Sequence, residues 1–147
     1  MKETAKQIKI AVEEAVPVLT SMTPEEVSSR PSPENWSKKE MLGHLIDSAA
    51  NNHQRLVRAA YGAAEQFPGY DQNRWVAIQR HQETPWEDLL QFWTVYNRHL
   101  CRLIERLPAA AFSARCGIGK EEPVTLEFVV RDYLRHLRHH LDRLLAR

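Results

Sequence analysis

The chain of 147 residues is long enough for one compact domain with a hydrophobic core, and 43% apolar residues argue against a disordered protein. Its 20 basic and 19 acidic side chains leave a net charge of +1, which gives no support for a nucleic-acid or membrane-surface partner. Two scattered cysteines, Cys101 and Cys116, form neither a disulfide framework nor a C-x-x-C site, so we expect a reducing compartment.

The N-terminal segment is predicted to be an amphipathic helix rather than a signal peptide. Charges interrupt its apolar runs, and no later stretch approaches the length of a membrane span, so we expect a cytoplasmic protein. From about residue 4 to residue 22, apolar residues recur at three- and four-residue steps. This spacing predicts a helix that Pro17 kinks or shortens.

The second predicted helix begins at Ser37. The segment from Ser37 to Glu40 has the spacing of a capping box, in which hydroxyl and carboxylate satisfy each other's end of the first turn. About twenty residues of mixed character follow this helix, with one short helix predicted around Trp75. A connection this long is unusual in a helical hairpin, so we expect a crossover that lets the second and third helices run parallel.

The third predicted helix begins with a second capping box, from Thr84 to Glu87, with proline at its first helical position, and ends at Pro108. After another irregular stretch, Thr125 is the predicted cap of a fourth helix that runs to the end of the chain. No segment shows a convincing strand pattern. Four amphipathic helices with one long crossover predict an all-α protein, a four-helix bundle that forms a single domain over residues 1–147.

The fourth helix carries three histidines within five residues. On a helical wheel, His136 and His140 lie together at one border of the apolar side, where their rings can converge on one point. His139 instead points to solvent among charged side chains. Two histidines four residues apart are common in helical metal sites. Alone, this spacing is a weak signal, and a solvated helix edge is the alternative.

The second helix places His44 at the border of its own apolar stripe. A polar line continues from it through Ser48, Asn51 and Arg55. A lone histidine in this position is more often structural than a ligand. Both helices nevertheless carry histidine at the margin of the core, where a cleft between bundle helices would open. Three neutral imidazoles would leave one position of a tetrahedral ion free, as in catalytic rather than structural zinc sites.

The other polar candidates are weaker. Three further histidines are expected to be solvated surface residues: His53, His81 and His99. Asn97 lies on the core side of the third helix, either as a satisfied core amide or as a group that supports the site. Asp47 could orient an imidazole or act as a base, although its wheel position favours solvent. Arg55 could bind an anionic substrate group or form a surface ion pair.

Three segments together resemble the DinB/YfiT-like superfamily: WSKKEMLGHLIDSAANNHQR, GYDQNRWV and YLRHLRHHLDRLL. The resemblance extends from about Trp36 to Leu145 in the expected order, and the first helix matches by position and amphipathicity. It implies a bundle with up-down-down-up topology and a divalent metal ion, often zinc or nickel, held by one histidine of the second helix and two of the fourth. The implied metal ligands are His44, His136 and His140.

The resemblance implies less about the reaction. Several relatives are thiol transferases that use bacillithiol, mycothiol or glutathione, and others are hydrolase- or isomerase-like. An enzyme of this kind would act on a small-molecule substrate, with a low-molecular-weight thiol as one candidate, through a thiol or water activated at the ion. The alternatives are a non-catalytic, stress-related protein that binds metal or a small ligand, and a dimerisation module without metal. The apolar faces and the dimers of relatives favour a homodimer.

Overall fold

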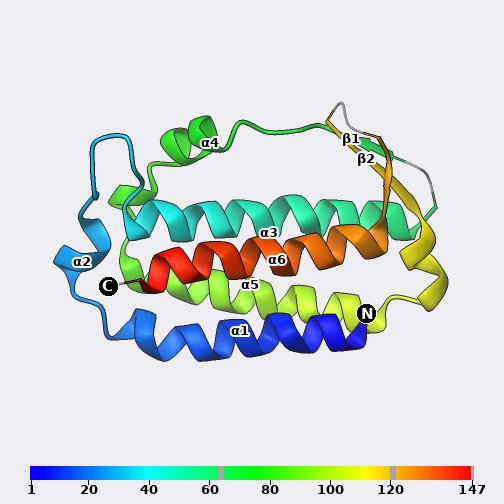
Figure 1. Ribbon diagram of the computed structural model, residues 1–147, viewed down its shortest axis with the longest axis horizontal. Helices are drawn as coiled ribbons and strands as arrows, with labels where there is room; N and C mark the ends of the chain where they lie inside the picture. Colours follow the sequence, from blue (N-terminus) through cyan, green and yellow to red (C-terminus); the bar gives the residue numbers. More distant parts are fainter. Residues whose placement is uncertain (63–64, 120–121, 147) are drawn as a thin grey trace.

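Four long helices form the body of the molecule in the computed structural model, which describes residues 1–62, 65–119 and 122–146 (Figure 1). They are α1 (Lys2–Thr20), α3 (Lys38–Ala60), α5 (Trp86–Arg106) and α6 (Leu126–Leu145). Helices α5 and α6 each pack against both α1 and α3. In chain order the four helices run up, down, down and up, so the all-α four-helix bundle predicted from the sequence is confirmed.

The helix boundaries confirm most of the sequence predictions. Helix α1 continues through Pro17 and ends three residues later. At the start of α3, the Ser37 side chain accepts a hydrogen bond from the backbone N–H of Glu40, and the Glu40 carboxylate accepts one from the N–H of Ser37. Thr125 caps α6 by accepting from the N–H of Phe128. Both predicted caps therefore fix where the two histidine-bearing helices begin.

The predicted capping box from Thr84 to Glu87 is wrong. The cap position of α5 is Pro85, which makes no side-chain cap hydrogen bond, and the helix begins at Trp86. The backbone N–H of Thr84 instead donates to the carbonyl of His81 at 3.1 Å, which closes the short 3-10 helix η1 (His81–Glu83). Thr84 is thus already part of the preceding turn, so its hydroxyl stands one residue too early to cap α5.

The crossover between α3 and α5 contains a short strand β1 (Glu65–Phe67) and helix α4 (Gln72–Gln79), which confirms the helix predicted around Trp75. The expectation of no strands is wrong. Strand β1 pairs in parallel with β2 (Arg115–Ile118), which pairs antiparallel with β3 (Val124–Thr125). Strands of two to four residues carry too little pattern to be read locally, because pairing between distant connections creates them.

Two further short segments complete the fold: α2 (Pro24–Ser28) before α3, and the 3-10 helix η2 (Ala109–Ser113) before β2. Among the described residues, no helix is both long and apolar enough to cross a lipid bilayer. Cys101 and Cys116 are both buried and free, as expected for thiols that form no disulfide framework.

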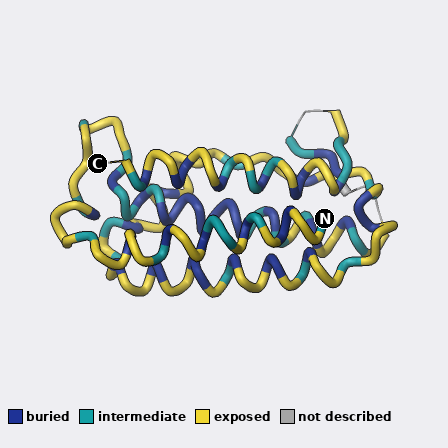
Figure 2. Tube along the Cα trace, turned by 60° about the horizontal axis from the view of Figure 1, so that its bottom comes forward, coloured by how far each residue is buried: buried dark blue, intermediate teal, exposed yellow. Residues whose placement is uncertain are grey.

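The core fills the space enclosed by the four helices, whose inward faces are buried along their full length (Figure 2).

Asn97, which is fully buried on α5, is a satisfied core amide. Its Nδ2 donates to the carbonyl of Trp93 at 2.9 Å, and its Oδ1 accepts from the hydroxyl of Tyr133 on α6 at 2.6 Å. The Asn97–Tyr133 hydrogen bond joins α5 to α6. Of the two roles left open by the sequence for Asn97, it supports that of a satisfied core amide.

Replacing Tyr133 by phenylalanine should lower the free energy of unfolding by about 1–3 kcal/mol, because the buried Asn97 Oδ1 loses its donor. Urea unfolding measures the change. Tyr61→Phe is the control, since this tyrosine is 71% exposed and should change stability by less than about 0.5 kcal/mol. Equal effects of the two substitutions would contradict the role assigned to this hydrogen bond.

Candidate metal centre

Three histidines from two antiparallel neighbours, α3 and α6, meet at one point. His44 is 1% exposed and His140 is 8% exposed, whereas His136 is half-buried. The ring centre of His44 lies 5.1 Å from that of His136 and 4.8 Å from that of His140. The rings of His136 and His140 are 4.4 Å apart, as expected from residues one helical turn apart.

The ring nitrogens have the spacing of ligands on one ion. One nitrogen from each of His44, His136 and His140 can be chosen so that all three lie within 4.8 Å of one another. The Nε2 atoms of His44 and His136 are 3.2 Å apart. Two nitrogens bound tetrahedrally to zinc at its usual bond length would be separated by about 3.3 Å. The observed spacing therefore fits a shared cation.

Burial keeps these imidazoles neutral. Burial, with a smaller contribution from nearby His136, lowers the pKa of His44 to about 4 and that of His140 to about 3. Burial also lowers the pKa of His136, against the opposing influence of Asp132. A neutral imidazole is the form that binds metal. The site is thus prepared for a cation without first having to lose protons at neutral pH.

Two buried nitrogens at the centre lack a hydrogen-bond partner among the described residues. In the described part of the chain, Nδ1 of His44 and Nδ1 of His140 are buried and have no hydrogen-bond partner. A single hydrogen bond between the Nε2 atoms of His44 and His136 would account for one contact and leave His140 unexplained. A cation held by all three rings accounts for their convergence, and imidazole donors suit zinc, nickel, copper and iron.

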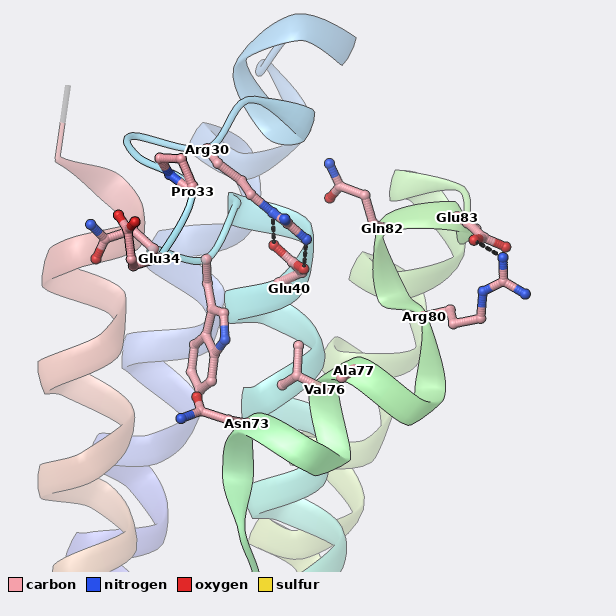
Figure 3. Close-up of a pocket in the computed structure, with 12 residues that line it drawn as sticks. Arg30, Pro33, Glu34, Glu40, Asn73, Val76, Ala77, Arg80, Gln82 and Glu83 are labelled. Carbon is pink, nitrogen blue, oxygen red and sulfur yellow. Dashed lines mark hydrogen bonds and ion pairs between the residues drawn. The ribbon is translucent and has the colours of Figure 1, made fainter.

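Trp36 covers the centre from the loop that precedes α3. Its indole ring lies 5.0 Å from the ring of His44. It lines a groove of about 570 Å³ on one side and a hollow of about 290 Å³ on the other, where Met41 and Arg143 also contribute. Figure 3 shows the groove between this loop and α4, with the ion pair of Arg30 and Glu40 on its wall. Trp36 therefore packs on His44 and lines both spaces, whereas none of the three histidines lines either of them.

Asp47 and His81 were expected to face solvent, and both predictions are wrong. Asp47 is 2% exposed and His81 is 6% exposed. The Oδ1 atom of Asp47 accepts from Nε2 of Gln79 on α4 at 2.7 Å, and its Oδ2 lies 3.6 Å from Nε2 of His81. The crossover forms a second layer over α3, which a wheel drawn for α3 alone does not include.

Gly43 is the one sequence signal that pointed to this second layer. A Cβ atom at Gly43 would lie 2.1 Å from the ring of His81, so only glycine leaves room for the imidazole. A glycine inside a helical pattern often marks such a close approach. Asp47 follows His44 by about one turn and acts on it, so the buried Asp47–His81 pair adjoins the centre, which the sequence analysis did not predict.

The other three histidines, which were expected to be exposed to solvent, differ in how exposed they are. His139 is exposed, as predicted. His99 is also exposed, but His53 is half-buried and its Nδ1 lies 3.0 Å from the hydroxyl of Tyr96. None of the three belongs to the set of converging ring nitrogens, although the ring of His139 packs beside that of His140 with centres 5.1 Å apart.

Comparison with known proteins agrees with this geometry. The family model for the DinB superfamily matches residues 7–143. The chain belongs to the DinB superfamily. A curated protein of Oceanobacillus iheyensis named "Putative metal-dependent hydrolase" is 29% identical over 105 residues, which are 71% of this chain and 60% of the relative. This DinB-superfamily chain therefore spans less than two thirds of that relative's length.

Two solved structures share the fold of this DinB protein. YfiT from Bacillus subtilis, described as "a probable metal-dependent hydrolase with an unusual four-helix bundle topology", aligns with a TM-score of 0.77 and 20% identity, over 97% of this chain and 81% of that one. A mycothiol-dependent maleylpyruvate isomerase aligns with a TM-score of 0.79 and 14% identity, over 97% of this chain and 59% of the isomerase. At these identities the likeness shows the common fold.

The neutral histidines predict that the metal-free protein loses stability as the pH falls from 6.5 towards 4. In that range the histidines of the unfolded chain bind protons while those of the folded chain do not, so acid favours unfolding. Each histidine that stays neutral contributes a slope of about 1.4 kcal/mol per pH unit. Urea unfolding of chelator-treated protein at several pH values measures this slope.

The histidine variants of α6 provide the comparison for this pH dependence. His140→Ala should show a shallower slope than the wild type, because one depressed pKa is removed. His139→Ala removes an exposed neighbour that is only a minor cause of the lowered pKa values of His136 and His140, so its slope should stay closer to the wild type than that of His140→Ala. Identical slopes in all three proteins would contradict the neutral, desolvated state assigned to the centre.

Proposed function

We propose that His44, His136 and His140 bind one divalent cation and that this protein is a metal-dependent enzyme of the thiol S-transferase or hydrolase type. The observation that carries the proposal is the convergence of three neutral imidazoles, two of them with buried, unpaired nitrogens, across the contact of α3 with α6. Three nitrogen ligands leave a position for a further ligand on a tetrahedral ion, which is the donor set of catalytic zinc sites.

The chemistry follows from the charge of such a site. A divalent ion, when bound, lowers the pKa of a water or thiol in its remaining position and so provides a nucleophile near neutral pH. The neutral imidazoles add no negative charge that would weaken this effect. Asp47 is the buried carboxylate nearest along α3, where its charge acts on His44, and the indole of Trp36 keeps bulk water away from that ring.

Both reaction types have support among the relatives. The curated relative and YfiT are named as metal-dependent hydrolases, which favours an activated water as nucleophile. The isomerase of the same fold depends on mycothiol, which favours an activated thiol. A small molecule is the expected substrate in either case. A centre of three histidines serves both reactions, since the incoming ligand decides which nucleophile forms.

Purified protein without a polyhistidine tag should contain about one equivalent of zinc or nickel per chain after incubation with that metal and removal of the excess. His44→Ala and His140→Ala should each hold less than a tenth of an equivalent, because two imidazoles bind a divalent ion far more weakly than three. His139→Ala should retain the wild-type content. Elemental analysis makes the measurement, and an empty wild-type protein would contradict the proposal.

A panel of thiol-conjugation and hydrolysis reactions tests the catalytic part separately. The wild type should turn over at least one substrate class, chelation should abolish that turnover, and His140→Ala should lower it by at least a hundredfold while His139→Ala keeps it. Activity that persists unchanged in His140→Ala would show that the centre does not perform it. A protein that binds metal but is inactive across the panel would be a metal-binding protein without a catalytic role.

A further inference from the structure

Arg55 is a cation that the fold leaves without a counter-ion. Its side chain is half-buried on α3, near Tyr70 of the crossover, Cys116 of β2 and Asp132 of α6, yet among the described residues it forms no ion pair. Its recorded hydrogen bond is a long one, with Nη1 3.4 Å from the Oδ1 of Asn52. A guanidinium has five N–H donors in a planar fork, so most of its donors remain available for a ligand.

The nearby acidic group on α6 is already engaged. Asp132 lies close enough to influence Arg55, but its Oδ1 accepts from Nε of Arg135 at 3.0 Å and from Nη2 at 2.6 Å. Burial lowers the pKa of Arg55, as expected for a cation that has lost water without gaining a paired anion. The local charge is therefore positive at Arg55.

Arg55 shares one face of α3 with His44 and Ser48. Eleven residues make slightly more than three turns of an α-helix, so Arg55 and His44 point in nearly the same direction, with Cα atoms about 16 Å apart along the axis. The hydrogen bond to Asn52 shows that the arginine leans back towards His44. Between them, Ser48 Oγ lies 3.4 Å from Nδ1 of His136. A polar path along α3 thus leads from the histidines to the guanidinium.

Tyr70 adds a second donor from the crossover, which passes above α3 in Figure 1. Its ring is half-buried and packs against Trp75 with centres 4.9 Å apart. Burial raises the pKa of its hydroxyl, and Asp47 and Arg55 are the charged groups that act on it. The phenol therefore stays protonated near Arg55, and a protonated hydroxyl can donate to an anion.

We propose that Arg55, with Tyr70, is a binding subsite for the carboxylate of an extended substrate whose other end reaches the three histidines. A guanidinium binds a carboxylate through two parallel charge-assisted hydrogen bonds, and partial burial strengthens them. Because His44 and Arg55 are far apart along α3, a short acid cannot reach both the metal centre and the guanidinium. The inference rests on the proposed function for the metal end and adds the substrate class: long organic acids with a metal-seeking group at the far end.

A series of ω-mercapto acids of increasing length measures the distance between the metal centre and Arg55. Zinc-loaded protein is titrated calorimetrically with mercaptopropionate, mercaptohexanoate and mercaptooctanoate, and with the mercapto alcohols of the same lengths, in which a hydroxyl replaces the carboxylate. For the wild type, the acid should bind at least tenfold tighter than its alcohol at the longer lengths and equally at the shortest. Arg55→Gln should abolish this preference, and Arg55→Lys should retain part of it.

Arg58→Gln is the matched control, because it removes the same charge from an exposed arginine one turn further along α3. It should keep the preference for the longer acids, and thermal unfolding confirms that every variant is folded. Acids and alcohols that bind the wild type equally at every length, or an acid preference that survives Arg55→Gln, would overturn the subsite. So would the absence of measurable binding by the longer acids.

Failure of the proposed function gives a different result from failure of the subsite. If the protein holds no metal, the acid preference can still appear and still depend on Arg55, in which case the subsite stands without the metal chemistry. If zinc binds and the thiols bind to it, but the carboxylate changes nothing, the metal proposal stands and the subsite falls. Repeating the titration with His140→Ala separates the two contributions.

Discussion

The register of α3 against the antiparallel α6 is the constraint on which the centre depends. It sets His44 opposite the turn that carries His136 and His140, with ring centres between 4.4 and 5.1 Å apart. A shift by one residue along either helix would rotate one partner by about 100° and end the convergence. The caps at Ser37 and Thr125 fix where the two helices begin, so local sequence signals help to set this register.

The fold also leaves some of the described buried polar atoms around the three histidines without hydrogen-bond partners. Among the described residues, five buried side-chain atoms have no hydrogen-bond partner, and four of them belong to the centre and its neighbours: His44 Nδ1, His140 Nδ1, Asp47 Oδ2 and His81 Nε2. A buried polar group without a partner costs about 1–3 kcal/mol. Several such unpaired groups close together therefore lower the free energy of unfolding. Asp47 Oδ2 and His81 Nε2 lie 3.6 Å apart and so partly compensate each other, which leaves the two imidazole nitrogens as the atoms of the centre without a partner among the described residues.

The sequence was sufficient to predict the bundle and the histidines but not their surroundings. Periodicity and caps identified the long helices, and the histidines of α3 and α6 stood at predictable borders of apolar stripes. The residues from Leu42 to Ala49 are, however, all buried, which no amphipathic pattern encodes. That burial comes from the crossover packed over α3, and it moves Asp47 from the expected surface into the interior. Long-range pairing of β1 with β2 likewise leaves no local signal.

The most direct test of the central claim is X-ray absorption spectroscopy of the zinc-loaded protein, since it reports the ligands of the bound ion. The account predicts about three imidazole nitrogens at roughly 2.0–2.1 Å, with one further light-atom ligand. Adding a thiol should replace that ligand with one sulfur at about 2.3 Å. A first shell of oxygen alone, or a sulfur ligand supplied by the protein before any thiol is added, would contradict the three-histidine centre.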